Sequence, residues 1–281
     1  MNTDSYFETG TGHAICEDYA LSGEYKGLYY AIGSDGCSSS DDTDTGARLL
    51  CHIAKRKIMN MHDSFRAFED PKMTELEKIL RILILQECKN IGNMLKLRSE
   101  NFDATLWIAT HCGRDVAVFG WGDGAVIKNC GELVQVTNLE YESNAPYYLS
   151  YGLSQERDAA YKKEYGSCYQ AVSDVLKMRG SEKLEGDYRH ERDCTAAFLM
   201  HEENALDGPM ISLSVCSDGI NTYQDKENNP ITVLDIAEEY SAYKNYSGEF
   251  TKRRMLKIKK EKDICGAHHI DDIFCATVHI K

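Results

Sequence analysis

The order of apolar patterns along the chain predicts an α+β domain, in which helices pack on antiparallel sheets. Strand-like segments open the chain, two amphipathic helical segments follow, and from residue 102 the apolar residues return to a period of two. Helices and strands therefore come in separate runs rather than in βαβ alternation, an order typical of α+β folds. The chain has 281 residues, of which 42% are hydrophobic. We expect one domain over residues 1–281 with a sizeable core.

The first part of the chain contains three predicted strands and two predicted helices. The strands are expected at residues 5–13, 16–25 and 27–36. A turn around Gly23 should join the last two. One helix should begin at Thr43 or Asp44, because apolar residues then recur every three or four positions. A second helix with a similar apolar face should follow Pro71.

The second part of the chain is dominated by strands. They are expected at residues 103–112, 115–124, 125–130, 132–138, 194–203, 210–219 and 271–280. The first four should form an antiparallel meander with turns at Gly113-Arg114, 122–124 and 129–131. Helices are expected within 231–243 and 250–262. Residues 141–192 are rich in Tyr and show no clean period, so we expect an irregular insertion or a small flap there.

Composition and charge exclude several classes of protein. The net charge of −13 disfavours binding to nucleic acid or to an anionic membrane surface, because both need clustered Lys and Arg. The densest apolar stretch, residues 79–88, is too short to span a bilayer. The first thirteen residues lack the basic and apolar regions of a secretory signal. The eleven cysteines form no Cys-x-x-Cys pair, which favours reduced thiols and a cytoplasmic location.

Acidic residues stand at the ends of apolar runs. Asp35 and Asp218 each end such a run and each precede a glycine, and the pairs Glu17-Asp18 and Asp271-Asp272 lie beside other predicted strands. Each Asp-Gly alone could be an ordinary turn. Carboxylates that converge at one sheet edge repel one another unless a cation neutralises them. Oxygen ligands suit Mg²⁺ or Mn²⁺, and Gly36 would let the backbone approach such an ion.

Six short motifs, taken in order, resemble those of the metal-dependent protein phosphatases of the type 2C family. They are "GHAICEDYA", "YYAIGSDGCSS", "FDATLWIAT", "GWGDGAVIK", "VCSDGI" and "HIDDIFCATVHI", and they span residues 10–280. The resemblance implies a four-layer αββα sandwich of two antiparallel sheets flanked by helices. It also implies the hydrolysis of phosphoserine and phosphothreonine in proteins by a water molecule that two metal ions activate.

The resemblance assigns roles to particular residues. Asp35 would bridge two Mn²⁺ or Mg²⁺ ions, and the carbonyl of Gly36 would bind one of them. Asp218 and Asp271 would hold the other ion. Glu17 and Asp18 would contact the ions or their bound water. Asp123 would join Asp218 at a weaker third metal site. His13 would bind the substrate phosphate. The partners implied are a phosphorylated protein substrate and a cognate Ser/Thr kinase system.

Three departures from the family pattern leave other functions open. Cys37-Ser38 stands where many members have His or a Gly-Gly pair, the turn at Asp123 lacks the usual Ser, and His13 replaces an Arg. A phosphatase fold used as a binding or regulatory module is one alternative. The other is a phosphohydrolase that acts on a small phosphorylated metabolite.

Three further patterns have simpler interpretations. The acidic stretch 41–46 lacks the twelfth-position Glu of a calcium loop, so we expect it to cap the helix that follows. His268 and His269 are expected in a solvated loop rather than as metal ligands, with His269 a candidate to contact a metal ligand rather than the ion. The basic run 252–262 could bind an acidic partner or phosphopeptide, but a solvated helix face is the expected structure.

Overall fold

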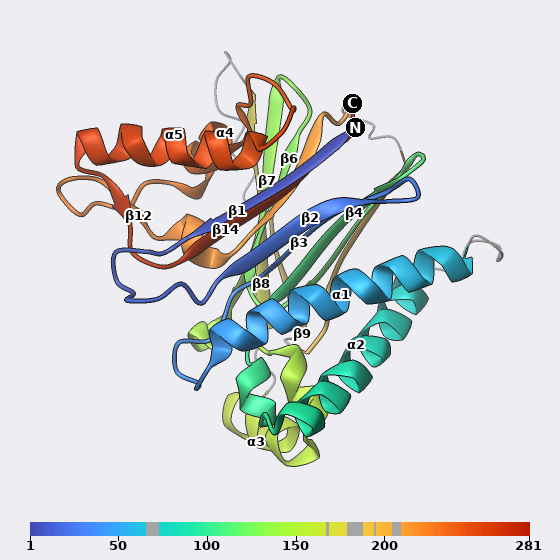
Figure 1. Cartoon of the computed structure of the whole chain (residues 1–281). Helices are drawn as coiled ribbons and strands as arrows, with labels where there is room; N and C mark the ends of the chain where they lie inside the picture. The colour runs from blue at the N-terminus through green and yellow to red at the C-terminus, as the bar shows by residue number, and fades with distance from the viewer. Residues whose placement is uncertain (66–72, 167–168, 179–187, 194, 204–208) are drawn as a thin grey trace.

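Two antiparallel sheets lie face to face with helices on both outer sides, as the sequence predicts (Figure 1). The computed structural model describes residues 1–65, 73–166, 169–178, 188–193, 195–203 and 209–281. The seven-stranded sheet has the order β1 (Asn2–Glu8), β14 (Ile273–His279), β11 (Ser212–Cys216), β6 (Gly124–Asn129), β7 (Leu133–Tyr141), β8 (Tyr169–Met178) and β9 (Tyr188–Asp193). The five-stranded sheet has the order β10 (Phe198–Glu203), β5 (Asp115–Trp121), β4 (Leu106–Cys112), β3 (Leu28–Ser34) and β2 (Tyr19–Tyr25).

Helices form the two outer layers. They are α1 (Thr43–Phe65), α2 (Met73–Leu95), α3 (Gln155–Tyr165), α4 (Val233–Ser241) and α5 (Phe250–Cys265). In Figure 1, α1 and α2 cover the five-stranded sheet, whereas α4 and α5 cover the other. Short 3₁₀ turns are η1 (Ser99–Phe102), η2 (Glu142–Asn144), η3 (Leu149–Leu153) and η4 (Asp218–Asn221). None of the helices in the described residues is long and apolar enough to cross a bilayer.

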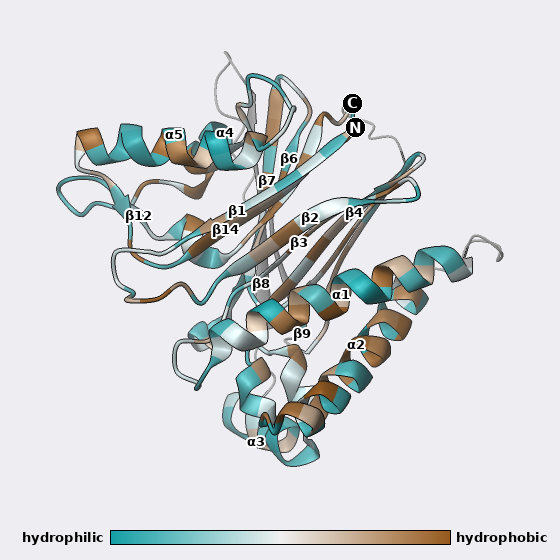
Figure 2. Ribbon diagram, viewed as in Figure 1, coloured by the Kyte–Doolittle hydropathy of each residue, from teal (hydrophilic) through white to brown (hydrophobic). Residues whose placement is uncertain are grey.

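The alternation of side chains along the strands creates three apolar interfaces between the four layers. On β4, Trp107 and Ala109 face the other sheet, while Leu106 and Ile108 face α1 and α2. On the seven-stranded sheet, residues such as Ile273 pack under α4 and α5. Figure 2 shows hydrophilic residues over much of α5, whose outer side faces solvent. Because successive side chains point to opposite faces, each strand contributes apolar residues to both faces of its sheet.

The two sheets approach one another closely at Gly33. A Cβ atom at this position would lie 2.0 Å from the ring of Phe274, which is completely buried in the opposite sheet. Only glycine therefore fits between the sheets at this point. At the other end of the sandwich the two chain termini lie side by side, because Asn2 pairs with His279 (Figure 1).

Three expectations about local structure were wrong. The turn between β2 and β3 lies at Lys26-Gly27, where both residues have positive φ, and Gly23 instead packs against Tyr30 on the neighbouring strand. The predicted meander is broken at residues 122–124, because β5 and β6 belong to different sheets. Gly122 (φ 86°) and Gly124 (φ 142°) allow the chain to cross between them.

The third expectation, an irregular insertion or a small flap over residues 141–192, was wrong only about the irregularity. The described part of this range contains α3 and the strands β8 and β9. β8 continues the sheet by pairing with β7 over nine residue pairs, from Leu133↔Met178 to Tyr141↔Gln170. Main-chain pairing tolerates polar and Tyr-rich strands, so the weak apolar period concealed them.

Candidate metal centre

The predicted acidic residues meet at one end of the sandwich. Asp35 follows β3, and Asp18 precedes β2 directly opposite, because Ser34 pairs with Tyr19. Asp218 follows β11, and its neighbour Gly219 packs so closely on the Asp271-Asp272 segment that a Cβ would lie 1.9 Å from the Asp272 carbonyl oxygen. Asp123 reaches the same place from the crossing between the sheets. Antiparallel register therefore brings together residues that are far apart in sequence.

Burial and mutual repulsion raise the pKa values of these carboxyl groups. Burial has the largest effect on Asp18, Asp35 and Asp123, and neighbouring carboxylates add to it. Burial and the charge of Asp271 raise the pKa of Asp218 to about 6. Without a cation, this cluster is therefore electrostatically unfavourable at neutral pH.

The donor set fits a hard divalent cation. Asp18 is 1% exposed, and its Oδ2 accepts a hydrogen bond of 2.7 Å from Ser217. Its Oδ1 is buried with no hydrogen-bond partner among the described residues. Buried carboxylate oxygens without a partner are costly unless a cation lies beside them. Such oxygens are ligands that Mg²⁺ and Mn²⁺ prefer.

Gly36 occupies a crowded position next to Asp35. A Cβ here would lie 3.0 Å from the carbonyl oxygens of both Glu17 and Thr43. The backbone on each side is also held, since Thr105 N donates to the Asp35 carbonyl at 2.8 Å and Cys37 N donates to the Asp103 carbonyl at 2.9 Å. Packing thus favours a glycine here, as does the proposed approach of its carbonyl to an ion.

His13 and Glu17 lie with Asp272, a residue to which sequence analysis assigned no role. One potential ligand atom from each of the three lies within 4.8 Å of the others. Asp272 is 2% exposed and accepts backbone N–H bonds from Gly10 (2.8 Å, Oδ1) and Glu17 (2.6 Å, Oδ2). It therefore fixes the 10–17 segment against β14. The adjacent acids Asp271-Asp272 were visible in the sequence, but only the register of β14 decides which of the two faces the 10–17 segment.

The imidazole of His13 lies between two carboxylates. Its Nδ1 is 3.2 Å from Asp272 Oδ2, and its Nε2 is 3.5 Å from Asp271 Oδ1. Burial lowers the pKa of His13, but Asp272, Asp271 and Glu17 outweigh this effect and raise it overall. The ring is therefore biased toward its positively charged form.

His269 is buried rather than solvated, so this expectation was wrong. It belongs to β13 (His268–His269), which pairs with β12 (Tyr223–Gln224). Its Nδ1 lies 2.7 Å from the Asp271 carbonyl oxygen, and its Nε2 lies 3.2 Å from Glu8 Oε1. His269 thus holds the backbone of Asp271 in place.

A partly buried ion pair links α3 to Asp103, which also bonds to the loop that follows Asp35-Gly36. Arg157 NH2 contacts both carboxylate oxygens of Asp103, at 2.9 and 2.7 Å. Asp103 also accepts a hydrogen bond from Ser40 at 3.0 Å. Tyr148 is buried beside Cys37, and burial followed by Cys37, Asp123 and Asp35 raises its pKa. Sequence analysis missed these residues, and nothing in their local sequence marks them.

The sequence profile of the protein phosphatase 2C family matches residues 10–244. No curated protein matches the chain by sequence. The fold is similar to that of three bacterial proteins of known structure. The first is the serine/threonine phosphatase Stp1 from Staphylococcus aureus, with 12% identity and a TM-score of 0.51 over 100% of this chain and 96% of that one. The second is PppA of Pseudomonas aeruginosa, described as a key regulatory component of T6SS, with 15% identity and a TM-score of 0.54 over 99% of this chain and 96% of that one. The third is the serine/threonine phosphatase of S. agalactiae, with 12% identity and a TM-score of 0.53 over 99% of both chains.

Proposed function

Because this chain belongs to the protein phosphatase 2C family, we propose that it removes phosphate from phosphoserine and phosphothreonine in proteins with the help of Mn²⁺ or Mg²⁺. The observation that carries this proposal is the buried group of carboxyls around Asp35, whose pKa values are raised, together with the partnerless oxygen of Asp18. Divalent cations would neutralise the repulsion within such a cluster.

The proposed ligand roles are those that the family resemblance implies, and the positions of the residues in the fold support them. Asp35 lies beside Asp18, Asp123 and Asp218, so it would contact two ions, with the Gly36 carbonyl next to one of them. The second ion would be held by Asp218 and Asp271. We propose Glu17 and Asp18 as further ligands, directly or through water, and Asp123 with Asp218 as a weaker third site.

The chain's own residues would bind and orient the substrate. When bound, the two ions supply Lewis acidity that lowers the pKa of water and offsets phosphoryl charge. His13 is 27% exposed and biased toward the cation, so it can donate an N–H to a phosphate oxygen. Tyr148 would restrict solvent access beside Asp35. We propose a phosphoprotein substrate, an opposing Ser/Thr kinase and a cytoplasmic location.

The first experiment is hydrolysis of p-nitrophenyl phosphate and of a phosphothreonine peptide, with Mn²⁺ and with EDTA. We expect activity that requires Mn²⁺ and falls at least a thousandfold in Asp35→Asn, because an electrostatic catalytic group is lost. The exposed Glu164→Gln is the control. Mn²⁺ binding without hydrolysis would contradict the proposal and favour a regulatory module. Hydrolysis of small phosphoesters alone would favour a metabolite phosphohydrolase.

A further inference from the structure

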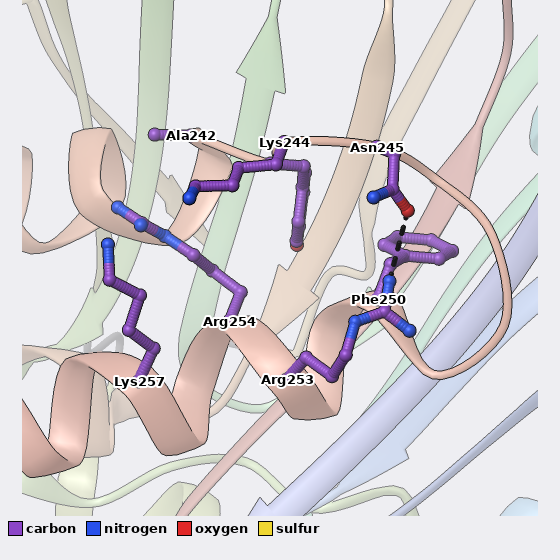
Figure 3. A pocket seen from close by; sticks show the side chains of 8 residues that line it. Ala242, Lys244, Asn245, Phe250, Arg253, Arg254 and Lys257 are labelled. Atoms are coloured by element: carbon purple, nitrogen blue, oxygen red, sulfur yellow. Dashed lines mark hydrogen bonds between the residues drawn. The ribbon is translucent and has the colours of Figure 1, made fainter.

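A cationic cavity lies on the outer face of the seven-stranded sheet, where the connection from α4 meets the first turns of α5 (Figure 3). Its volume is about 230 Å³. The lining residues are Ala242, Tyr243, Lys244, Asn245, Phe250, Arg253, Arg254 and Lys257. Four of these eight are cationic and none is acidic, although the chain as a whole carries a net charge of −13.

The cationic side chains converge rather than diverge into solvent. Figure 3 shows the nitrogen atoms of Lys244, Arg254 and Lys257 gathered at one end of the cavity, while Arg253 turns toward Asn245. Arg254 Nε donates to the Glu239 carbonyl, and Arg253 NH2 donates to Asn245 Oδ1 at 3.1 Å and to the Ser247 carbonyl at 2.8 Å. These bonds fix the planes of both guanidinium groups.

The floor of the cavity belongs to the rigid core. Phe250 is 2% exposed, and its ring packs edge-on against Tyr243 at 5.1 Å between centroids. The hydroxyl of Tyr243 lies 2.9 Å from Thr277 Oγ1 on β14. The cavity is therefore shaped by buried residues rather than by surface side chains alone.

Carboxylates near the cavity pair with only some of its cations. Glu239 pairs with Lys262 at 2.8 Å, and Glu249 pairs with Lys252 at 2.9 Å, both outside the lining. Lys257 has Glu261 at 3.3 Å, but both side chains are about half exposed, so screening weakens the pair. Lys244 makes no hydrogen bond or ion pair within the part of the chain that the structure describes. Lys244 and Arg253, neither of which has an acidic partner among the described residues, thus leave the lining with excess positive charge.

We propose that this cavity binds a phosphate group. Arginine presents planar N–H donors that match phosphate oxygens, and lysine adds compact positive charge. At roughly 30 Å³ per water molecule, the cavity has room for a phosphate and the first atoms of the molecule that carries it. Repulsion among the three cationic groups that converge, those of Lys244, Arg254 and Lys257, would decrease when a dianion binds between them.

This site is separate from the metal centre and from the helix N-terminus. Tyr243 contacts β14 at Thr277, five residues beyond Asp272, which corresponds to roughly 16 Å along a strand. The cavity also lies on the outer face of the sheet. The first N–H groups of α5, those of Thr251 and Lys252, are already bound by Asp4 Oδ2 at 2.6 and 3.1 Å.

The test is calorimetric titration of inorganic phosphate into the full chain in EDTA, where the metal centre is acidic and repels the anion. We expect saturable binding that weakens about tenfold for each charge removed in Lys244→Gln and Lys257→Gln, since charge-assisted bonds are lost. Lys260→Gln, an exposed lysine of α5 outside the lining, is the control and should bind like the wild type. No saturable binding, or equal weakening in all three variants, would overturn the proposal.

A second titration distinguishes the sources of the phosphate group. Tighter binding of a phosphoserine peptide than of inorganic phosphate, again sensitive to Lys244→Gln, would identify a phosphoprotein as the ligand. Equal or weaker binding of the peptide would identify a small phosphorylated molecule. Because both titrations are done in EDTA, their outcome does not depend on the proposed phosphatase activity.

Discussion

Replacement of Asp218 by Asn should stabilise the metal-free protein at alkaline pH. Burial and the charge of Asp271 raise the pKa of this carboxyl from its ordinary 3.8 to about 6, a difference of about 2.2. One pKa unit corresponds to about 1.4 kcal/mol, so ionised Asp218 costs the folded state about 3 kcal/mol. The folded state holds this proton more tightly than the unfolded state does. Stability is therefore highest below pH 4 for this group and is lost as the pH rises through 6.

Thermal unfolding in EDTA at pH 5 and pH 8 measures this effect. At pH 8 we expect Asp218→Asn to unfold roughly 6 °C above the wild type, at about 2 °C per kcal/mol for a chain of this size. At pH 5 the difference should shrink, because the wild-type carboxyl is then largely protonated. Saturating Mn²⁺ should raise the midpoint of the wild type more than that of the variant.

The control and the refuting result are both clear. Glu164→Gln removes one exposed carboxylate from α3 and should change neither midpoint. If Asp218→Asn were no more stable than the wild type at pH 8, or if its advantage were equal at both pH values, repulsion within the acidic cluster would not be the cause.

Two further substitutions test the packing around the site. Asp103→Asn should lower the free energy of unfolding in urea by about 2 kcal/mol, because Arg157 loses its bidentate carboxylate partner and keeps only Glu100, at 4.0 Å. A comparable loss in the exposed Asp41→Asn would contradict this. Gly33→Ala should cost about 1–3 kcal/mol or more, because its methyl group would overlap the ring of Phe274. The matched change Gly92→Ala, whose new atom would meet neighbours at 3.5 Å, should be neutral or slightly stabilising in the same denaturation series.

Much of the fold can be predicted from local patterns. The period of three to four after Thr43 and the period of two in β4 each follow from which faces must be buried, and both were confirmed. The acids at strand ends could likewise be identified as a group, because an acidic residue directly after an apolar run is uncommon. Each of these patterns is contained within a few neighbouring residues.

Other features depend on which distant segments meet. The Gly122–Gly124 turn has the same local appearance whether it closes a hairpin or crosses between sheets, and only the packing of the two sheets separates these cases. Likewise, Asp103 and Arg157 are 54 positions apart. Their attraction exists only once α3 lies against the segment between η1 and β4.

The sequence by itself determined the class of fold, the helices α1, α2, α4 and α5, most strands and the family of the acidic motifs, because burial of apolar faces and turn chemistry are local properties. Only the tertiary structure decided that Asp272 rather than Asp271 anchors the 10–17 segment, that His269 is buried, and that four cations of α5 and its preceding loop surround one cavity. These facts depend on register and on the approach of distant backbones, which no local pattern specifies.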